Sequence, residues 1–527
     1  MSANDPPDET SPPPPSLAAG DRRIADHEAE KQSGRGAEAW RSLVVVFLIG
    51  LALRLWGLGQ ESLWADEYYT LLTASQPSFG AVMDRVVNAE PHPPLYFLIM
   101  HAWLALAGTS DIALRLPSAL AGALTVPLLF LLMRLLFPSR PGAAGVAAGL
   151  LAFSPMHIWY SQEARAYALL LLVQVGAMAL LVAAFRAAEG PDQPGRERRV
   201  RLCLIASALM AVALPQMQYY AGLIWMGHLT ALFWWGRHRP GRLGTGWVIG
   251  LAIMLLGVLM PAWGALKELL AGYYEAHFHV RLGPSVFFHI GRAQWIGPFW
   301  SPMPWWVQGL GVAAGAGLAG YGAWLVFGSK RRGSAVALVL GSALFWTFVF
   351  PIAFSFIKTV IFYGQRYLVI ALPMTVALTA VGVTAARGRG RLLAAALVGI
   401  LLICQAWWLW GHAKYREKRT WDTVAEHLAA EVPPDVRFVV LPARLAGLLA
   451  RYFPRRVEVN GADRVAELPK HARPAGQSMV VVSIKDLRPW LSKFYPGRNL
   501  VPRVYETHRP AQELWIFKLA GPASAAE

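Results

Sequence analysis

Residues 42–59 read SLVVVFLIGLALRLWGLG, an apolar run that is long enough to cross a bilayer as one helix. No signal-peptidase cleavage site follows the run, so we expect this helix to be retained in the mature protein. Residues 1–41 before it are rich in Pro, Ser, Gly and mixed charge and lack apolar periodicity. They predict a disordered cytoplasmic tail in front of the first membrane span.

Ten further apolar runs follow and bring the predicted number of spans to eleven. They cover residues 113–136, 142–158, 166–186, 201–216, 219–235, 246–265, 304–327, 334–357, 366–386 and 391–411. The apolar run 93–107 is left out, because a helix of its length is about 22 Å long and a hydrocarbon core is ~30 Å thick. We expect it to lie in the membrane interface or to re-enter.

Composition supports this class of protein. Hydrophobic residues make up 55% of the 527 residues and charged ones only 15%, too few for a soluble surface of this size. The net charge of +17 comes without a basic stripe interleaved with aromatic residues, so we predict no nucleic-acid partner. Cys203 and Cys404 both lie in apolar runs, which makes a disulfide framework or a cysteine-based metal site improbable.

Arginine and lysine clusters orient the spans. With the tail in the cytoplasm, the inner loops hold Arg134, Arg140, Arg186, Arg196, Arg198, Arg199, Arg201, Arg237, Arg239, Arg242, Lys330, Arg331, Arg332, Arg387, Arg389 and Arg391. Counting 93–107 as a span would move every cluster outside, against the positive-inside rule. Eleven spans therefore place the loops 59–112, 159–165 and 266–303 outside a bacterial inner membrane, and they export residues 412–527.

The exported stretch 412–527 differs in character from the spans. Short β-rich runs occur at 437–441, 479–483 and 513–517, with helical patterns at 421–430 and 443–452. We therefore predict a polytopic α-helical membrane protein of about eleven spans, with interfacial helices in the first outer loop and a small C-terminal α/β periplasmic domain. Its parts are a tail, 1–41, a transmembrane domain, 42–411, and the soluble domain, 412–527.

Two adjacent acids, Asp66 and Glu67, follow the first span within Trp64-Ala65-Asp66-Glu67-Tyr68-Tyr69. A carboxylate at the membrane surface can act as a general base on an acceptor hydroxyl or amine, or help to bind a metal. The competing interpretation is a helix N-terminus, which favours acidic residues in its first turn.

Glu90 and His92 lie at the other end of the same outer loop. Three prolines in Glu90-Pro91-His92-Pro93-Pro94-Leu95-Tyr96 fix the backbone around them. The pair could bind a divalent cation or orient a phosphate. The alternative is a turn that only introduces the interfacial helix.

Further charged residues are expected at the same surface. Glu163 and Arg165 lie between the third and fourth spans, where they could also pair with each other or snorkel. Gln365, Arg366 and Tyr367 open the tenth span, and an arginine on this cation-poor side suggests an anionic partner such as a lipid-linked phosphate, with a purely structural arginine as the alternative. His279, with His277 and Arg281, is a weaker candidate ligand in the loop 266–303.

These motifs together resemble those of bacterial membrane glycosyltransferases of the GT-C superfamily. The resemblance covers about 42–411 and includes the Arg-Leu-Pro sequence at 115–117. It is nearest to the protein mannosyltransferase-like enzymes, the aminoarabinose transferases of lipid A and the rhizobial galacturonosyl transferases of lipopolysaccharide.

The resemblance implies a polyprenyl-phosphate-linked sugar as donor and an inverting transfer on the periplasmic face. It implies catalytic roles for Asp66, as the base, and Glu67, and donor-phosphate binding by Arg165, Gln365, Arg366 and Tyr367. Glu90, His92, Glu163 and His279 would bind the donor or a divalent cation. The partners would be membrane lipids and a glycolipid, protein or polysaccharide acceptor.

Two other function classes remain open at the level of sequence. A lipid-sugar flippase or other transporter would need the same lipid specificity without chemistry, but the charged groups here cluster outside the membrane and no broken helices occur in matching halves. An oligosaccharide ligase or polymerase would share the polytopic layout. Only a donor assay separates it from a transferase of single sugars.

Overall fold

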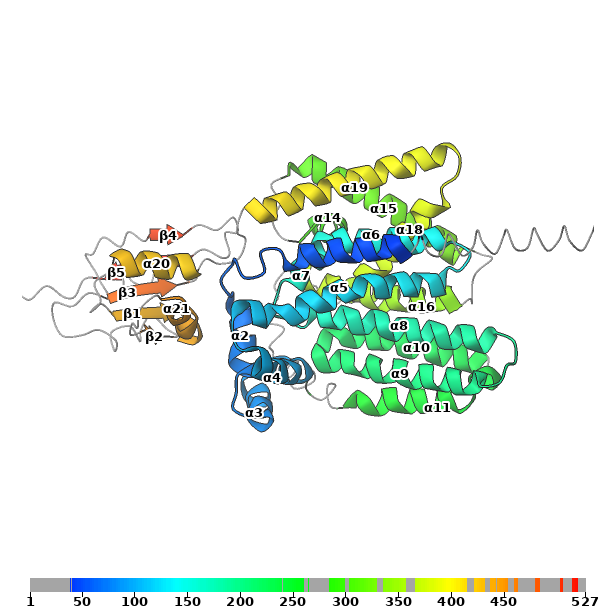
Figure 1. The fold of residues 1–527 in the computed structure, drawn as a ribbon, viewed down its shortest axis with the longest axis horizontal. Helices are drawn as coiled ribbons and strands as arrows, with labels where there is room; N and C mark the ends of the chain where they lie inside the picture. The colour runs from blue at the N-terminus through cyan, green and yellow to red at the C-terminus, as the bar shows by residue number, and fades with distance from the viewer. Residues whose placement is uncertain are drawn as a thin grey trace, which may run out of the picture.

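The structure is a computed structural model. It describes residues 38, 40–238, 240–259, 264, 284–298, 303–328, 335–356, 365–414, 421–431, 437–441, 443–453, 459–462, 479–483, 503–505 and 514–519. Figure 1 shows two parts, a bundle of long helices and a small sheet with two helices at one end of it. We call the end of the bundle that carries the sheet the outer end.

Helices form the bundle and the layer that covers its outer end. An unlabelled helix through residues 40–55 comes first. The next helices are α2 (Ala65–Ala74), α3 (Phe79–Ala89), α4 (Leu95–Ala107), α5 (Asp111–Leu136), α6 (Pro141–Phe153), α7 (Pro155–Ser161), α8 (Tyr167–Glu189), α9 (Arg196–Met217), η1 (Tyr219–Ala221) and α10 (Gly222–His238). They are followed by α11 (Pro240–Gly257), α14 (Pro284–Trp295), α15 (Trp305–Phe327), α16 (Ala335–Leu344), η3 (Phe345–Val349), α17 (Phe350–Ser355), η4 (Gln365–Ala371), α18 (Leu372–Ala385) and α19 (Arg389–Lys414).

The predicted polytopic helical fold is confirmed, because every one of the eleven apolar runs contains helix in the described residues. Among those residues, seven helices are long and apolar enough to cross a membrane, and the α6–α7 pair adds an eighth if it is one span. The total of eleven spans therefore stays a prediction. Helix α4 is short, as expected for the run 93–107, and lies with α2 and α3 across the outer end (Figure 1).

The predicted span over 142–158 is bent in the structure. The chain bends by 57° between α6 and α7, at Ser154. Such a break frees backbone carbonyls, which need other donors inside a membrane. The fully buried Arg54 supplies them, because its guanidinium donates to Leu151 O and Ala152 O. The first helix thereby holds α7 and the turn after it in place.

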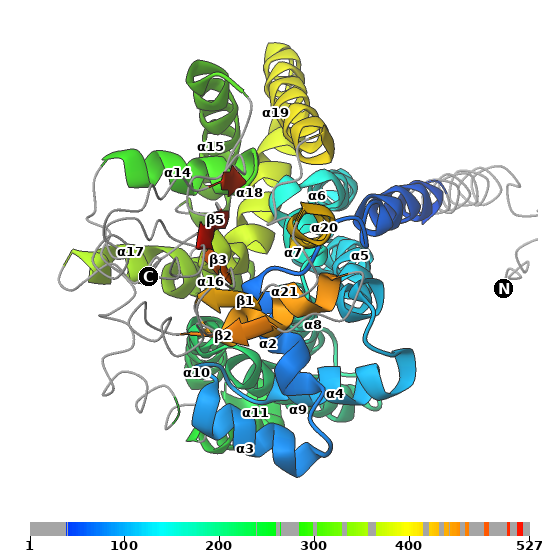
Figure 2. The same cartoon turned by 90° about the vertical axis from the view of Figure 1, so that its left-hand side faces the viewer.

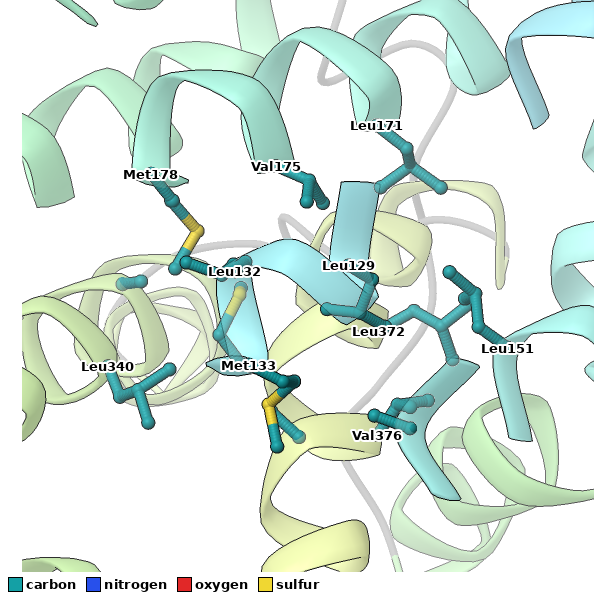
Figure 3. Close-up of a cluster of buried hydrophobic side chains, with 14 of the residues drawn as sticks. Leu129, Leu132, Met133, Leu151, Leu171, Val175, Met178, Leu340, Leu372 and Val376 are labelled. Atoms are coloured by element: carbon teal, nitrogen blue, oxygen red, sulfur yellow. The ribbon is translucent and has the colours of Figure 1, made fainter. Parts of the chain in front are cut away.

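The core of the bundle is packed with aliphatic side chains from five helices. Figure 3 shows Leu129, Leu132 and Met133 of α5 between α8, which supplies Leu171, Val175 and Met178, and Leu340, Leu372, Val376 and Leu151. Since lipid is as apolar as these side chains, close packing rather than hydrophobic burial holds such a bundle together. Gly322 of α15 and Gly382 of α18 allow a close approach, because a Cβ on either would collide with the backbone of the other helix.

Exposed tryptophans mark two levels of the bundle. Trp56, Trp305 and Trp410 lie at outer ends of their helices, and Trp40, Trp234 and Trp324 lie at the opposite ends. Indoles favour the two membrane–water boundaries. The bundle between the two levels therefore matches a membrane-embedded part, and α2, α3 and α4 lie at its outer boundary.

The C-terminal part is the predicted small α/β domain. It contains α20 (Trp421–Glu431), β1 (Arg437–Leu441), η5 (Ala443–Leu445), α21 (Ala446–Tyr452), β2 (Val459–Gly461), β3 (Met479–Ser483), β4 (Arg503–Tyr505) and β5 (Leu514–Leu519). The strand order is β2-β1-β3-β5-β4, with β1 parallel to β2 and β3, and β5 antiparallel to β3 and β4. The sequence patterns predicted β1, β3 and β5 and missed the two three-residue edge strands.

Candidate active site

Helix α2 presents the two adjacent acids at the outer end of the bundle. It begins at Ala65, so that Asp66 and Glu67 both fall in its first turn. Consecutive helical residues point about 100° apart, and the two carboxylates accordingly reach different surroundings. Both acids therefore lie in the first turn of a helix, as the competing interpretation expected. That interpretation does not explain the contact of Asp66 with Arg366.

Glu67 lies beneath the surface and is completely buried. Its Oε1 accepts hydrogen bonds from Arg115 Nε at 2.8 Å and from Ala164 N–H at 2.9 Å. Its Oε2 accepts from Arg115 Nη2 at 2.7 Å and from Trp64 N–H at 3.3 Å. Four donors saturate the carboxylate, and Glu67 therefore joins α2, α5 and the turn before α8.

Asp66 faces the opposite way, toward two arginines. Arg366 Nη1 donates to Asp66 Oδ2 at 2.8 Å, and Arg165 Nη1 donates to the Asp66 backbone oxygen at 3.3 Å. About a quarter of each side chain of the Asp66–Arg366 pair is exposed. Burial acts to raise the pKa of Asp66, but the charges of Arg366 and Arg165 outweigh it, and the pKa lies below its ordinary value.

His92 completes the cluster as a neutral ring. Arg165 Nη2 lies 3.0 Å from His92 Nε2, and since a guanidinium can only donate, this ring nitrogen accepts and the proton resides on Nδ1. Burial, and then the charge of Arg165, lower the pKa of His92 to about 3. With His92 neutral, the charges in contact are +1 on Arg165, +1 on Arg366 and −1 on Asp66, a sum of +1.

Glu90, two residues before His92, makes its hydrogen bond with a different partner. Thr73 Oγ1 donates to Glu90 Oε1 at 2.6 Å, and Arg85 Nε donates to the same hydroxyl at 3.1 Å. Burial raises the pKa of Glu90 above its ordinary value, although the hydrogen bond from Thr73 opposes this. The Glu-Pro-His-Pro-Pro turn therefore sends Glu90 to α2 and α3 and His92 to Arg165.

A small cavity opens beside this cluster. It is lined by His92, Tyr96, Phe97, Arg165, Ala166, Tyr167, Met217 and Gln218. The polar atoms of its lining that are buried with no hydrogen-bond partner among the described residues include His92 Nδ1 and Tyr167 Oη. Buried polar groups are normally satisfied, so these two are available to a ligand that enters the cavity.

The described residues around His92 do not fit a divalent cation. Its Nε2 accepts from a guanidinium, whose positive charge repels a metal ion, and Glu90 Oε1 is taken up by Thr73. Within the described ranges, no group of three or more His, Cys, Asp or Glu side chains is arranged to hold a metal. We therefore derive no step of the reaction through a metal.

The remaining candidate residues are placed as follows. Glu163 is buried next to the turn at Arg165, whose N–H donates to Glu163 O at 2.8 Å, while the Arg165 side chain turns to Asp66 and His92. The ring of Tyr367 packs against that of Tyr220, with 4.8 Å between the ring centroids and an interplanar angle of 38°. Gln365 begins η4, and only its backbone is described. His279, with His277 and Arg281, lies outside the described residues.

Sequence reasoning gave no role to Arg115, Thr73 or Tyr167. Arg115 belongs to the Arg-Leu-Pro sequence that carried the resemblance, and an arginine inside an apolar run was a signal that it has a buried acidic partner. Tyr167 follows Arg165 in a quoted motif, but nothing local indicates that its hydroxyl faces a cavity. Thr73 carries no sequence signal, because its role depends on the fold of the turn at Glu90.

The chain is similar to known proteins in sequence and in fold. A family model described as dolichyl-phosphate-mannose-protein mannosyltransferase matches residues 91–264. No curated protein sequence matches the chain.

Two solved structures share the fold. The crystal structure of ArnT from Cupriavidus metallidurans bound to undecaprenyl phosphate has a TM-score of 0.54 and 16% identity, and the match covers 91% of this chain and 99% of that one. The archaeal oligosaccharyltransferase AglB from Archaeoglobus fulgidus, in complex with an inhibitory peptide and a dolichol-phosphate, has a TM-score of 0.50 and 14% identity. That match covers 81% of this chain and 65% of AglB.

The solved structures are too distant to show more than a common fold. The family model adds a match in sequence over residues 91–264 of this chain, which include His92 and Arg165 of the cluster and Arg115, the partner of Glu67. Together, the sequence match over residues 91–264 and the shared fold support a place for the chain in the GT-C superfamily of membrane glycosyltransferases.

Proposed function

We propose that the protein transfers a sugar from a polyprenyl-phosphate donor to an acceptor at the outer face of a bacterial inner membrane, with inversion at the anomeric carbon. The observation that carries the proposal is the pair of Asp66 and Arg366, which join segments 300 residues apart at the outer end of the bundle. Undecaprenyl phosphate in the ArnT structure and dolichol-phosphate in the AglB structure support a lipid phosphate as part of the donor.

The charge of the cluster suits this donor. A glycosyl phosphodiester carries one negative charge, which matches the sum of +1 on Asp66, Arg165 and Arg366. When the anomeric C–O bond breaks, the phosphate leaves as a monoester and gains a second negative charge. The guanidinium groups of Arg366 and Arg165 stabilise this charge where it develops.

Asp66 takes the role of base. The phosphate competes for Arg366, which releases Asp66 Oδ2 toward the acceptor. The acceptor oxygen attacks the anomeric carbon, a C–O bond forms to it as the bond to phosphate breaks, and the acceptor proton passes to Asp66. A carboxylate of low pKa suffices, because the transition state resembles an oxocarbenium ion and the acceptor proton becomes acidic as the new bond forms.

Glu67 has a positioning role in this scheme, in place of the catalytic role expected from the sequence. All four of its hydrogen bonds are made inside the protein. It fixes the N-terminus of α2, so that Asp66 points to Arg366.

The distribution of charge supports the proposed localisation. The arginine-rich loops lie at the end of the bundle opposite the cluster, which by the positive-inside rule is cytoplasmic. The donor phosphate, the acceptor and the C-terminal domain would then meet on the extracytoplasmic side. The charged cluster at the outer boundary does not favour a flippase, which needs polar groups along a path through the membrane.

Mass spectrometry of glycolipids and glycoproteins tests the proposal. Cells lacking the protein are complemented with wild type, with Asp66→Asn, or with Asp84→Asn, an exposed acid of α3 in the same loop. We expect a mass of one hexose or pentose to be restored by wild type and Asp84→Asn and not by Asp66→Asn. Restoration by Asp66→Asn in a folded, membrane-inserted protein would remove Asp66 as the base.

A further inference from the structure

The segment 58–67, which carries Asp66, is held from two sides. From the bundle, Arg115 donates to Leu58 O at 2.9 Å, Glu61 O at 2.8 Å and Ser62 O at 3.1 Å. Its other contacts go to Glu67, within the same segment. Arg115 thus ties residues 58–62 and Glu67 to the bundle, in addition to the contacts that Ala164, Arg165 and Arg366 make with Glu67 and Asp66.

The C-terminal domain holds the other side. The last residue of α21, Tyr452, accepts the N–H of Leu63 at 2.7 Å and donates its own hydrogen to Asp111 Oδ2 at 2.6 Å. Its neighbour Arg451 binds the second oxygen, Asp111 Oδ1, at 2.7 Å and the backbone oxygen of Thr109 at 2.7 Å. We call Leu63, Asp111, Arg451 and Tyr452 the α21 clamp.

A second contact lies at the start of the domain. The N–H of Trp421, the first residue of α20, donates to Ser62 Oγ at 3.0 Å, and the Trp421 side chain is completely buried. Figure 2, which looks onto the outer end, shows α21 over α2. Both helices of the domain therefore reach segment 58–67.

Apolar side chains also pack between the C-terminal domain and the segment that follows the first helix. Leu63, Tyr68 and Leu71 of the first outer loop belong to the same buried apolar cluster as Trp421 and Leu448 of the domain. At Gly447 of α21, a Cβ would collide with Tyr68 Oη. Glycine at 447 thus leaves room for the hydroxyl of Tyr68, which lies two residues from Asp66.

We propose that the C-terminal domain is a positioning element for the reaction, and that the α21 clamp sets where Asp66 lies relative to Arg366. This rests on the proposed function, because it assigns a role in the same site. Leu63 precedes Asp66 by three residues, so a shift of the clamp moves the start of α2. A misplacement of about 1 Å at a reacting group can lower a rate as much as 10²-fold.

The clamp itself is tested by hydrogen exchange on the purified full-length protein. Tyr452→Phe keeps the ring and removes the acceptor of the Leu63 N–H. We expect the amides of segment 58–67 to exchange faster than in wild type. The exchange of the amides of α8 and α9 should not change. Tyr321→Phe, on the exposed face of α15, is the matched control and should leave segment 58–67 unchanged. Unchanged exchange in Tyr452→Phe would overturn the proposal.

Its effect on the reaction is tested by kinetics with the donor identified under the proposed function. We expect Tyr452→Phe and Asp111→Asn each to lower kcat by about tenfold or more, with KM for the donor within about twofold. The double variant should lose little more than either single one, because both act through the same contact. Arg451→Lys, which keeps the charge on Asp111, should recover part of kcat relative to Arg451→Ala.

The outcomes separate the two proposals. Wild-type protein that transfers no sugar contradicts the proposed function, and the clamp is then judged by the exchange experiment alone. Active wild type with unchanged kcat in Tyr452→Phe and Asp111→Asn overturns the positioning role, even if exchange becomes faster. If Asp111→Asn does not fold, the kcat values of Tyr452→Phe and Arg451→Lys test the positioning role instead.

Discussion

Arg115 binds both carboxylate oxygens of Glu67 in a fully buried pair, whereas the neighbouring Asp66 stays at the surface of the site. Two adjacent acids of one helix turn therefore have different roles. Asp66 faces the arginines that would bind a phosphate. Glu67 instead joins α2 to α5 and to the turn before α8.

Loss of the buried partner should destabilise the protein. Arg115→Ala leaves the Glu67 carboxylate buried without its counter-ion, and we expect a loss of about 3–5 kcal/mol. Asp192→Ala is the control, since the exposed Asp192 pairs with Arg196 at 3.3 Å in a surface pair whose contribution should be about 0–1 kcal/mol. Thermal unfolding in detergent measures both. Similar shifts for the two variants would contradict the structural role of Arg115.

Replacement of Arg366 by lysine should weaken the donor complex. Lysine keeps the positive charge, but it loses the planar fork that can contact Asp66 and a phosphate together. The loss of a charged hydrogen bond corresponds to about 1.5–3 kcal/mol, or roughly ten- to 150-fold in kcat/KM. Steady-state kinetics with the donor measure it. A kcat/KM equal to that of wild type would remove Arg366 from the donor site.

Stability should depend on pH through His92. Its pKa is lowered from 6.5 to about 3 in the folded protein, so in this window the unfolded chain binds the proton and the folded protein does not. The free energy of unfolding should therefore fall as the pH is lowered from about 6.5 toward 3, by at most about 1.4 kcal/mol per pH unit for this proton.

His92→Gln isolates this effect, because glutamine does not titrate. Between about pH 7 and about pH 5 the variant should lose less stability than wild type. Thermal unfolding of both proteins at the two pH values gives the difference. Equal losses would show that His92 takes up its proton in the folded protein. The lowered pKa of Asp66 adds a loss only below the ordinary carboxyl range, outside this interval.

Two glycines of α15 should respond oppositely to alanine. A Cβ at Gly322 would collide with the Leu378 carbonyl of α18, and backbone cannot move aside without separating the helices. We expect Gly322→Ala to destabilise by about 1–3 kcal/mol. Gly320→Ala meets nothing within 4 Å and should be neutral or stabilise the helix by about 0.5–1 kcal/mol. Unfolding in detergent compares them, and a stable Gly322→Ala variant would mean that α15 and α18 are not in close contact.

Patterns local in sequence determined much of the fold. Apolar runs long enough to cross a bilayer predict helices wherever they occur, and short β-rich runs predicted β1, β3 and β5. The charge on the loops predicts an orientation of the chain, because that preference depends only on which residues flank a span. The bend at Ser154 was not predictable, since nothing local indicates that Arg54 would satisfy the freed carbonyls from another helix.

The candidate residues were also found from the sequence, because adjacent acids, a rigid Pro-His-Pro turn and isolated arginines are unusual beside apolar helices. Their division of roles was decided only by the tertiary structure. Asp66 meets Arg366 across 300 residues, and Glu67 meets Arg115 across 48. Which of two neighbouring carboxylates is saturated, and which stays open to a ligand, depends on contacts between helices that no local pattern encodes.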